Sequence, residues 1–240
     1  MKKYRILMTP ENARKCHDGT KTVTRRVIVP QPPEGAEYAG MDRGIASWTY
    51  PDRDGETNYW HAKPKYRPGD IVAIAETHWR WGRWASQSRA GRPSRRFDPS
   101  CYKQYGDEVL FRDPQRAGCD ASGNRYHKRP GLFMPFDLAR TYWEIGGVGA
   151  ERLHDITNTD ILAEGIEPLE GDAPTDDPWD DFEVHYVQAF RELWDSISAK
   201  RGYPWAGNWW VWRHEGKRVE LKGAECGYTH QHERSLKPIE

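Results

Sequence analysis

Residues 18–26 have the sequence Asp-Gly-Thr-Lys-Thr-Val-Thr-Arg-Arg. This segment, named here the signature segment, places one lysine, three threonines and two arginines directly after Gly19. A solvated helix face rarely carries this composition. Hydroxyl and cationic groups at this spacing can bind a phosphate or a polar base edge, and a lysine near a threonine hydroxyl can support nucleophilic chemistry. We therefore take the signature segment as the candidate functional segment.

Both flanks of the signature segment predict regular structure. Thr9 and Pro10 are typical of a helix start, and this helix is expected to end near His17, before Gly19. Short strands are predicted at residues 4–8 and 27–29. The position of the signature segment is therefore expected to be fixed by its neighbours.

The rest of the chain alternates between strands, helices and long loops. Strands are predicted at residues 45–50, 71–79, 109–112, 139–145 and 209–221. A short helix is predicted at 158–164, and the apolar spacing at 181–199 predicts an amphipathic helix. We expect an α+β fold in which a small β-barrel is flanked by helices and carries long loop insertions. We expect one domain over residues 1–222, insertions at about 30–65, 80–131 and 167–181, and a polar tail over 223–240.

The charges balance over the whole chain but not locally. Lys and Arg total 36, as do Asp and Glu, which argues against a uniformly basic nucleic-acid binder. Residues 80–129 are nevertheless rich in arginine, and residues 150–195 are rich in acidic side chains. The basic block suits a phosphate backbone, and the acidic loop at 172–181 is a candidate contact for a host protein. Both blocks could equally be solvated insertions.

Composition also indicates in which compartment the protein occurs and whether it binds a metal or cofactor. No apolar run approaches the ~18 residues of a membrane span, and the apolar part of the N-terminus is too short for a signal peptide. We expect a cytoplasmic protein of a bacterial or phage-infected cell. The four cysteines form no CxxC pair, which indicates reduced thiols without metal or cofactor. A metal group from Cys101, Cys119 and His127 is the less favoured alternative.

Several motifs occur together in an order that resembles one known family. Residues 19–26 resemble the Gly-x-Lys-x-x-Thr-Arg-Arg signature of ASCH domains, and residues 68–70 with 75–79 resemble the Pro-Gly-Asp and Glu-Thr-x-Trp motifs of that family. Further segments resemble the larger phage and prophage subgroup of this family. They are Met134-Pro135 with Arg140, and residues 151–156, 163–166, 190–197 and 209–212. The resemblance covers about residues 4–221, apart from the insertions. Phe133 stands where the subgroup often has histidine, and Asn208-Trp209 where it often has Asn-Pro-Trp.

This resemblance implies a PUA-like β-barrel with a cleft and a link to RNA, single-stranded DNA or modified nucleosides. Some small ASCH proteins hydrolyse the amide of acetylcytidine, and their proposed catalytic residues match Lys21, Thr24 and Glu76. Another member of the family is reported as a ribonuclease. The resemblance therefore implies a ligand class without selecting one reaction.

The residues themselves leave catalysis and binding open. In a hydrolase, Thr24 would attack a carbonyl carbon, Lys21 with a depressed pKa would be the base, and Glu76 would protonate the leaving amine. In a binding protein, the same groups would contact a phosphate or a base edge. The ligand-binding set that we expect is Thr22, Arg25, Arg26, Arg140 and Trp79, with Trp79 as the stacking ring.

A structural interpretation is also open, because an arginine of the signature segment could form a buried ion pair with Glu76 that has no function. We favour a protein that binds nucleic acid or a modified nucleoside. An acylcytidine amidohydrolase or nuclease, and a phage-type protein that binds a host protein, are the alternatives. The sequence predicts no oligomeric state.

Overall fold

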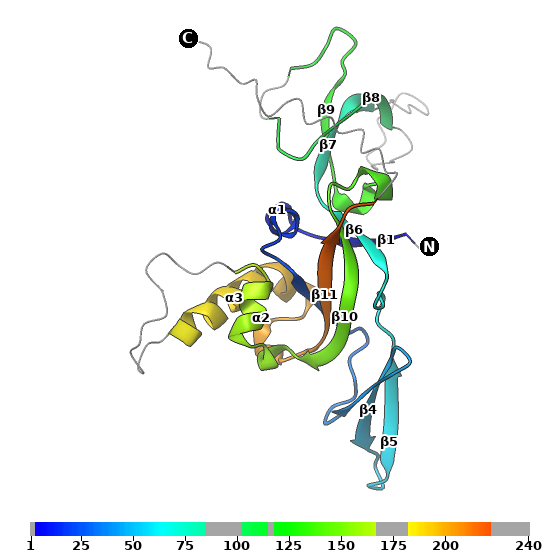
Figure 1. Ribbon diagram of the computed structural model, residues 1–240, viewed down its shortest axis with the longest axis vertical. Helices are drawn as coiled ribbons and strands as arrows, with labels where there is room; N and C mark the ends of the chain where they lie inside the picture. The colour runs from blue at the N-terminus through cyan, green and yellow to red at the C-terminus, as the bar shows by residue number, and fades with distance from the viewer. Residues whose placement is uncertain (1–2, 85–101, 115–117, 167–181, 222–240) are drawn as a thin grey trace, which may run out of the picture. The chain divides into compact units, whose positions relative to one another are not determined.

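A computed structural model describes residues 3–84, 102–114, 118–166 and 182–221. Within these ranges the chain is a mixed α+β protein built mostly from strands (Figure 1). The strands are β1 (Tyr4–Leu7), β2 (Val23–Val27), β3 (Glu37–Asp42), β4 (Ile45–Pro51), β5 (Thr57–Ala62), β6 (Ile71–Ala75), β7 (His78–Trp84), β8 (Tyr102–Leu110), β9 (Arg125–Arg129), β10 (Tyr142–Arg152) and β11 (Trp210–Val219). The helices are α1 (Pro10–Asp18), α2 (Asn158–Ala163) and α3 (Phe182–Ser198), with short 3-10 turns η2 (Gly131–Phe133), η3 (Phe136–Leu138), η4 (Leu153–Asp155), η5 (Ala199–Arg201) and η6 (Trp205–Gly207).

The described strands form three sheets. One has the order β1-β6-β10-β11-β2, and the two others have the orders β3-β4-β5 and β8-β7-β9. The described residues also divide into two compact units. Unit 1 contains Arg14–Val72 and Thr141–Val219, and unit 2 contains Arg5–Ala13 and Ala73–Arg140. The signature segment therefore belongs to unit 1.

In unit 1, β10 and β11 form a long antiparallel pair, and β2 runs antiparallel along the other side of β11. Residue pairs across β2 and β11 include Arg25 with Arg213 and Thr24 with His214. Because side chains alternate along a strand, the two arginines share one face of the sheet and the Thr–His pair shares the other. The helices α2 and α3 lie together on one side of β10 and β11 (Figure 1). Their core consists of Leu153, Ile156, Ile161, Tyr186, Phe190, Trp194 and Val211.

The sheet β3-β4-β5 of unit 1 buries one of its faces around Trp48. This indole is 0% exposed, and its ring centroid lies 5.0 Å from that of Trp60 and 5.6 Å from that of Trp210. Tilted and edge-to-face contacts of this kind stabilise aromatic pairs beyond their burial of apolar area. The cluster contains Ile28, Ala36, Ala46, Trp48, Ala150, Trp210 and Trp212.

In unit 2, β7 is the central strand of its sheet and pairs antiparallel with β8 and β9. The segment that follows β9 passes close to the end of β6. A Cβ atom at Gly131 would lie 2.9 Å from the carbonyl oxygen of Ala75, so only glycine fits there without a shift of the backbone. This close approach fixes the path of the chain beside Glu76.

The helices and the last strand confirm their predictions. Thr9 Oγ1 accepts a hydrogen bond from the Asn12 amide at 3.2 Å, and Gly19 follows α1 with φ of 84°. Thr157 caps α2 by accepting from the Asp160 amide at 3.2 Å. The bounds of α2, α3 and β11 agree with the predicted ranges to within two residues.

The expectations for several strands were wrong. The strand predicted at 27–29 is β2 at Val23–Val27, so half of the signature segment is strand. The single strand predicted at 71–79 is interrupted at Glu76 and Thr77. Of residues 30–65, only 45–50 were predicted as strand, yet three strands form there because cross-strand pairing and burial outweigh weak local propensity. In the insertion at 80–131, β7, β8 and β9 pair in the same way.

The β-barrel that we expected is not closed. The described strands form three open sheets, each with two edge strands, whereas a barrel requires every strand to pair on both sides. The acidic insertion at 167–181 and the tail at 223–240 lie outside the described residues, as do residues 85–101 of the basic block. Among the helices of the described ranges, none is long and apolar enough to span a membrane.

Candidate functional site

The signature segment is held by backbone hydrogen bonds to three elements. The Lys21 amide donates to the carbonyl of Lys15 in α1 at 3.0 Å, and the Thr22 amide donates to the carbonyl of Ala163 in α2 at 2.8 Å. The carbonyl of Thr22 accepts from the Gly216 amide of β11 at 2.8 Å. Because its backbone is tied on both sides, the segment presents its side chains in one defined arrangement.

Lys21 is buried and bound to Glu164, the residue that ends α2. Its side chain is 2% exposed, and its Nζ donates to the Glu164 carbonyl at 2.8 Å and forms an ion pair with Oε2 of the same residue. An amine acts as a general base through a free lone pair. An ammonium that donates to a carboxylate and a carbonyl has none, so this arrangement does not present Lys21 as a base.

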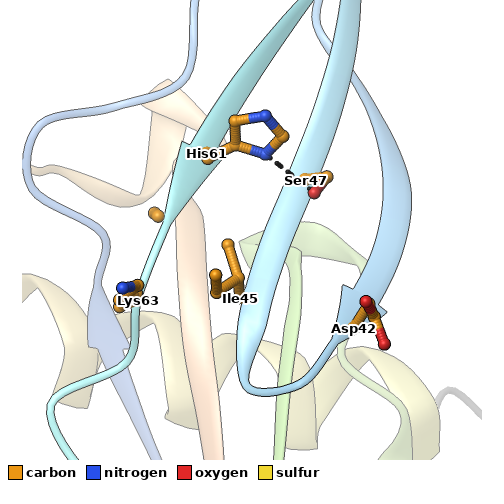
Figure 2. A pocket seen from close by; sticks show the side chains of 6 residues that line it. Asp42, Ile45, Ser47, His61 and Lys63 are labelled. Atoms are coloured by element: carbon orange, nitrogen blue, oxygen red, sulfur yellow. Dashed lines mark hydrogen bonds between the residues drawn. The ribbon is translucent and has the colours of Figure 1, made fainter.

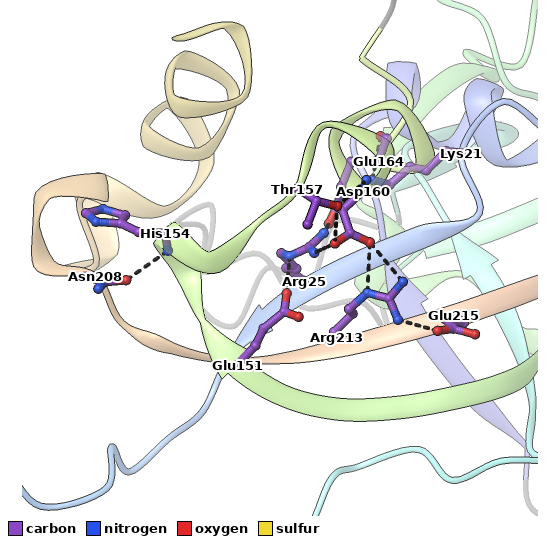
Figure 3. A network of polar contacts seen from close by, with 10 residues as sticks. All are labelled: Lys21, Arg25, Glu151, His154, Thr157, Asp160, Glu164, Asn208, Arg213 and Glu215. Carbon is purple, nitrogen blue, oxygen red and sulfur yellow. Dashed lines mark hydrogen bonds and ion pairs between the residues drawn. The ribbon is translucent and has the colours of Figure 1, made fainter. Parts of the chain in front are cut away.

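Arg25 is bound by three carboxylates on the same face of the sheet. Its Nε lies 2.6 Å from Glu151, its Nη2 lies 3.0 Å from Asp160, and its Nη1 lies 3.3 Å from Glu164. The Arg25 side chain is 1% exposed. Glu164 therefore joins Arg25 to Lys21 in one buried network (Figure 3).

The network reaches solvent at Arg213. The guanidinium of Arg213 lies between two carboxylates: its Nη2 is 2.9 Å from Asp160, and its Nη1 forms an ion pair with Glu215 (Figure 3). The side chains of Asp160, Arg213 and Glu215 are 15%, 27% and 50% exposed. Together with Glu151, which is 22% exposed, they form what we call the open edge of the network.

Burial and charge act differently on the two half-buried carboxyl groups of this edge. Burial raises the pKa of Glu151, and the charge and hydrogen bond of Arg25 oppose that rise only in part. Burial would also raise the pKa of Asp160, but hydrogen bonds from Arg213 and the charge of Arg25 outweigh it, and the pKa is lowered. Asp160 is therefore held as a carboxylate, while Glu151 is the more readily protonated of the two.

The charge balance of the network does not favour an anion. Three cations meet four carboxylates: Lys21, Arg25 and Arg213 against Glu151, Asp160, Glu164 and Glu215. A phosphate would add negative charge to a set that already has an excess of carboxylates. Lys21 and Arg25 of the signature segment are therefore arranged as ion-pair partners, and a neutral polar ligand suits the open edge better.

Thr24 lies on the face of β2 opposite Arg25 and is 4% exposed. Its cross-strand neighbour is His214, which is 1% exposed and which the sequence analysis did not identify. Burial, and then the charge of Arg26, lowers the pKa of His214 to about 4, so its imidazole is neutral at pH 7. The period-two pattern of β11 was the available signal, because it places His214 in line with Trp210 and Trp212.

Two further residues of the signature segment differ in exposure. The side chain of Thr22 is exposed, and Arg26 is half-buried on the face of β2 that carries Thr24. Arg26 pairs with Trp212 across the strands, beside the aromatic cluster. The structure thus brings Lys21 and Arg25 together through Glu164, while Thr24 and Arg26 lie on the other face.

Glu76 belongs to unit 2, where it pairs with Arg140. Its two carboxylate oxygens lie 2.7 and 3.0 Å from Nε and Nη2 of Arg140, and Glu76 is 1% exposed. Burial raises the pKa of Glu76, and the bidentate arginine opposes the rise. Trp79, the expected stacking ring, is 9% exposed with Nζ of Lys128 at 5.8 Å from its ring. These three expected site residues therefore lie in unit 2, with Glu76 and Arg140 serving as partners of each other.

Among the described residues, no group of three or more His, Cys, Asp and Glu side chains is arranged to hold a metal ion. Neither a protein-family model, nor a curated protein, nor a solved structure matches this chain.

Proposed function

We propose that this chain binds a nucleoside-class ligand at the open edge of the network formed by Glu151, Asp160, Arg213 and Glu215. The observation that carries the proposal is the Arg213 side chain, which is 27% exposed and whose guanidinium is held between two carboxylates. The buried part of the network fixes the position of Asp160. Arg25 contacts Asp160, and Glu164 joins Arg25 to Lys21. A polar edge that is held in place in this way loses little freedom on binding.

Nucleobases suit this edge because they are neutral and present donors and acceptors side by side. Carboxylates accept from exocyclic amines, and arginine donates to ring nitrogens and carbonyl oxygens of bases. Glu151 and Arg213 together offer both functions, and Asp160 keeps Arg213 oriented. The ligand is a free or modified nucleoside, or a base of RNA or single-stranded DNA.

Hydrolysis of an acylated cytidine is the second candidate, and one observation favours it. Thr24 and His214 are cross-strand neighbours, and a neutral imidazole is the kind of base that activates a hydroxyl. In this version His214 takes the role that the sequence assigned to Lys21. Both residues are at most 4% exposed, so a substrate would first have to open the strand pair.

We also propose that the chain is an ASCH-type, PUA-like protein. The support is the placement of its motifs. The signature segment ends on β2, and its Lys21 and Arg25 meet Glu164 of the Ala-Glu-Gly motif at 163–165. The Glu of the Glu-Thr-x-Trp motif meets Arg140. Residues that belong to different motifs of the resemblance are thus ion-pair partners within each unit.

The test is a binding titration of unlabelled nucleosides, with cytidine, acetylcytidine, uridine, adenosine and guanosine as the panel. We expect Arg213→Met to weaken the preferred nucleoside about 5- to 150-fold, because one good polar base contact contributes about 1–3 kcal/mol. The matched control is Arg14→Met, since Arg14 forms a surface ion pair with Asp18 and its side chain is 56% exposed.

Three outcomes decide between the candidates. Selective binding that is lost in Arg213→Met and kept in Arg14→Met supports the proposal. Equal affinity of both variants for every nucleoside contradicts it. Release of acetate from acetylcytidine that is abolished by Thr24→Val and by His214→Gln would favour the hydrolase instead.

A further inference from the structure

The sheet β3-β4-β5 has one open face opposite the buried Trp48 face. Strand alternation and the register place three rows of residues on it. One row contains Asp42 and Ile45, the next contains Gly40, Ser47 and His61, and the third contains Glu37, Thr49 and Tyr59. Lys63 follows β5 at the end of the first row (Figure 2).

The open face is hollowed at its first and second rows. A hollow of about 490 Å³ is lined by Asp42, Ile45, Ser47, His61, Ala62 and Lys63. Gly40 pairs with Ser47 and contributes no side chain, and a Cβ there would meet no atom within 4 Å. Two of the lining residues are bonded to each other, because the Ser47 hydroxyl and Nδ1 of His61 are hydrogen-bonded at 2.9 Å (Figure 2). The volume lies in the range of sites for small ligands.

Two aromatic rings on β5 form a parallel pair beside the hollow. The rings of Tyr59 and His61 are 5° from parallel with centroids 6.4 Å apart, and Tyr59 is 62% exposed. Most of the large hydrophobic residues in the described ranges are buried, and Tyr59 is one of the few that are exposed. Parallel rings with solvated faces are what unpaired bases stack on.

Arg43 is held in a conformation that arginine rarely adopts. It is the first of two residues in the turn between β3 and β4, with φ of 48°, and Gly44 follows with φ of 75°. Such turns favour Asn, Asp and Gly at the first position. Side chains of Arg43 and Asp42 are both 91% exposed, with 3.9 Å between their charged groups. Arg43 has a backbone conformation that arginine disfavours, and its side chain is in solvent, where no packing requires it. Such a residue indicates a functional role.

Charges are divided between the two ends of this sheet. Arg43 and Lys63 lie at the end that holds the hollow, where Asp42 is the acidic neighbour. The turn between β4 and β5, at the other end, carries three acidic residues and Arg53. A negatively charged backbone is therefore attracted to the hollow end and repelled from the other.

We propose that the open face of β3-β4-β5 binds a segment of single-stranded nucleic acid. Bases stack on Tyr59 and His61, and a phosphate is bound by Arg43 and Lys63. The Asp42 carboxylate and the Ser47 hydroxyl accept from an exocyclic amine of a base in the hollow. The face thus favours adenine, cytosine and guanine, which carry that amine, over uracil and thymine. This site is separate from the open edge at Arg213 and does not depend on the nucleoside bound there.

The experiment measures fluorescence anisotropy of labelled homopolymeric oligonucleotides of adenosine, cytidine and uridine over a range of salt concentrations. We expect tighter binding of the adenosine and cytidine strands. Tyr59→Leu should weaken binding about 5- to 150-fold, as loss of a stacking ring does, and Tyr59→Phe should retain it. Arg43→Asn should reduce the slope of log affinity against log salt by about 0.7.

Arg43→Asn also controls for folding, because asparagine suits the turn better than arginine. We expect an unchanged or higher melting temperature together with the weaker binding. Arg53→Asn removes the same charge from the acidic turn and should leave oligonucleotide binding unchanged.

The inference is overturned if no oligonucleotide binds at low salt, or if Tyr59→Leu binds as the wild type does. It is also overturned if Arg53→Asn weakens binding as much as Arg43→Asn, since that would show non-specific attraction. If the open face binds a protein ligand and no oligonucleotide, that result also overturns the inference. Unlabelled nucleosides carry no phosphate, so loss of oligonucleotide binding with retained nucleoside binding contradicts this inference and leaves the proposed function standing for a free or modified nucleoside.

Discussion

Glu164 balances two buried cations with one side chain. Its Oε2 contacts the ammonium of Lys21, and its Oε1 lies 3.3 Å from the guanidinium of Arg25. All three side chains are at most 5% exposed. A buried charge whose partner is removed is far more costly than the pair itself is stabilising. The role of Glu164 is therefore best tested by removing its charge at constant shape.

We predict that Glu164→Gln lowers the free energy of unfolding by about 3–5 kcal/mol, because it leaves Lys21 without its carboxylate in a buried site. Urea denaturation at neutral pH measures this change. The control is Glu215→Gln in the same network, whose side chain is 50% exposed. This control should change stability by at most about 1 kcal/mol, as surface ion pairs do. Equal losses in the two variants would contradict the assigned burial of Lys21.

At the scale of the elements, the pairing of β10 with β11 brings the ring of Trp143 over Gly216. Gly216 lies opposite Ile145 in the register, and Trp143 is 1% exposed. A Cβ at Gly216 would overlap the Trp143 ring, whereas a Cβ at Gly149 of β10 would meet no atom within 4 Å. The glycine is therefore required by packing across strands and not by its backbone angles.

We predict that Gly216→Ala destabilises the protein by about 1–3 kcal/mol or more, because a buried indole has to move. Gly149→Ala is the matched control, with the same chemical change in the partner strand and space for the methyl group. Thermal unfolding of both variants measures the difference. If the two melting temperatures change equally, the tight contact at Trp143 is not present in solution.

Elements differ in how well local sequence predicts them. The caps of α1 and α2 and the apolar stripe of α3 are local signals, and these helices were predicted to within two residues. β3 and β5 were missed, because they lie among loops rich in Pro, Gly and charged residues, and their sheet gains stability only after Trp48 packs on Trp210. The contact of Trp48 with Trp210 joins segments far apart in sequence and is not visible in the local sequence of either one.

At the scale of the whole molecule, buried histidines connect folding to pH. Burial lowers the pKa of His78 and His214, which are 0% and 1% exposed, and that of His214 falls to about 4. In the unfolded chain a histidine titrates near pH 6.5. Between about pH 6.5 and pH 4 the unfolded state therefore binds more protons than the folded state, and stability falls as pH falls.

We predict that His214 contributes about 3 kcal/mol to this loss of stability between about pH 6.5 and pH 4, and nothing above that range. Denaturation curves measured across this range for the wild type and for His214→Gln test it. The variant should show the weaker dependence on pH. His61→Gln, at an exposed position of β5, should keep the dependence of the wild type. An unchanged pH dependence in His214→Gln would show that the imidazole is not buried neutral.

The residues of the candidate site also differ in whether local sequence could identify them. The sequence identified Lys21 and Arg25 by composition alone, and both lie in the network. It did not identify Glu164 as their partner, which is 143 residues from Lys21, nor His214 opposite Thr24. Chemical type is visible at each position, but the partner that sets its charge state comes from another element.

Local sequence was sufficient to predict the helices, the strands β1, β4 and β11, and the concentration of cations and hydroxyls in the signature segment. These features depend on caps, periodicity and composition over a few neighbouring residues. The tertiary structure was needed to show that carboxylates neutralise Lys21 and Arg25, that Thr24 and Arg25 point to opposite faces of β2, and that residues 30–65 form a sheet with an open aromatic face. Each of these depends on which segments pair and what they bury, and that free energy exists only once distant parts of the chain are in contact.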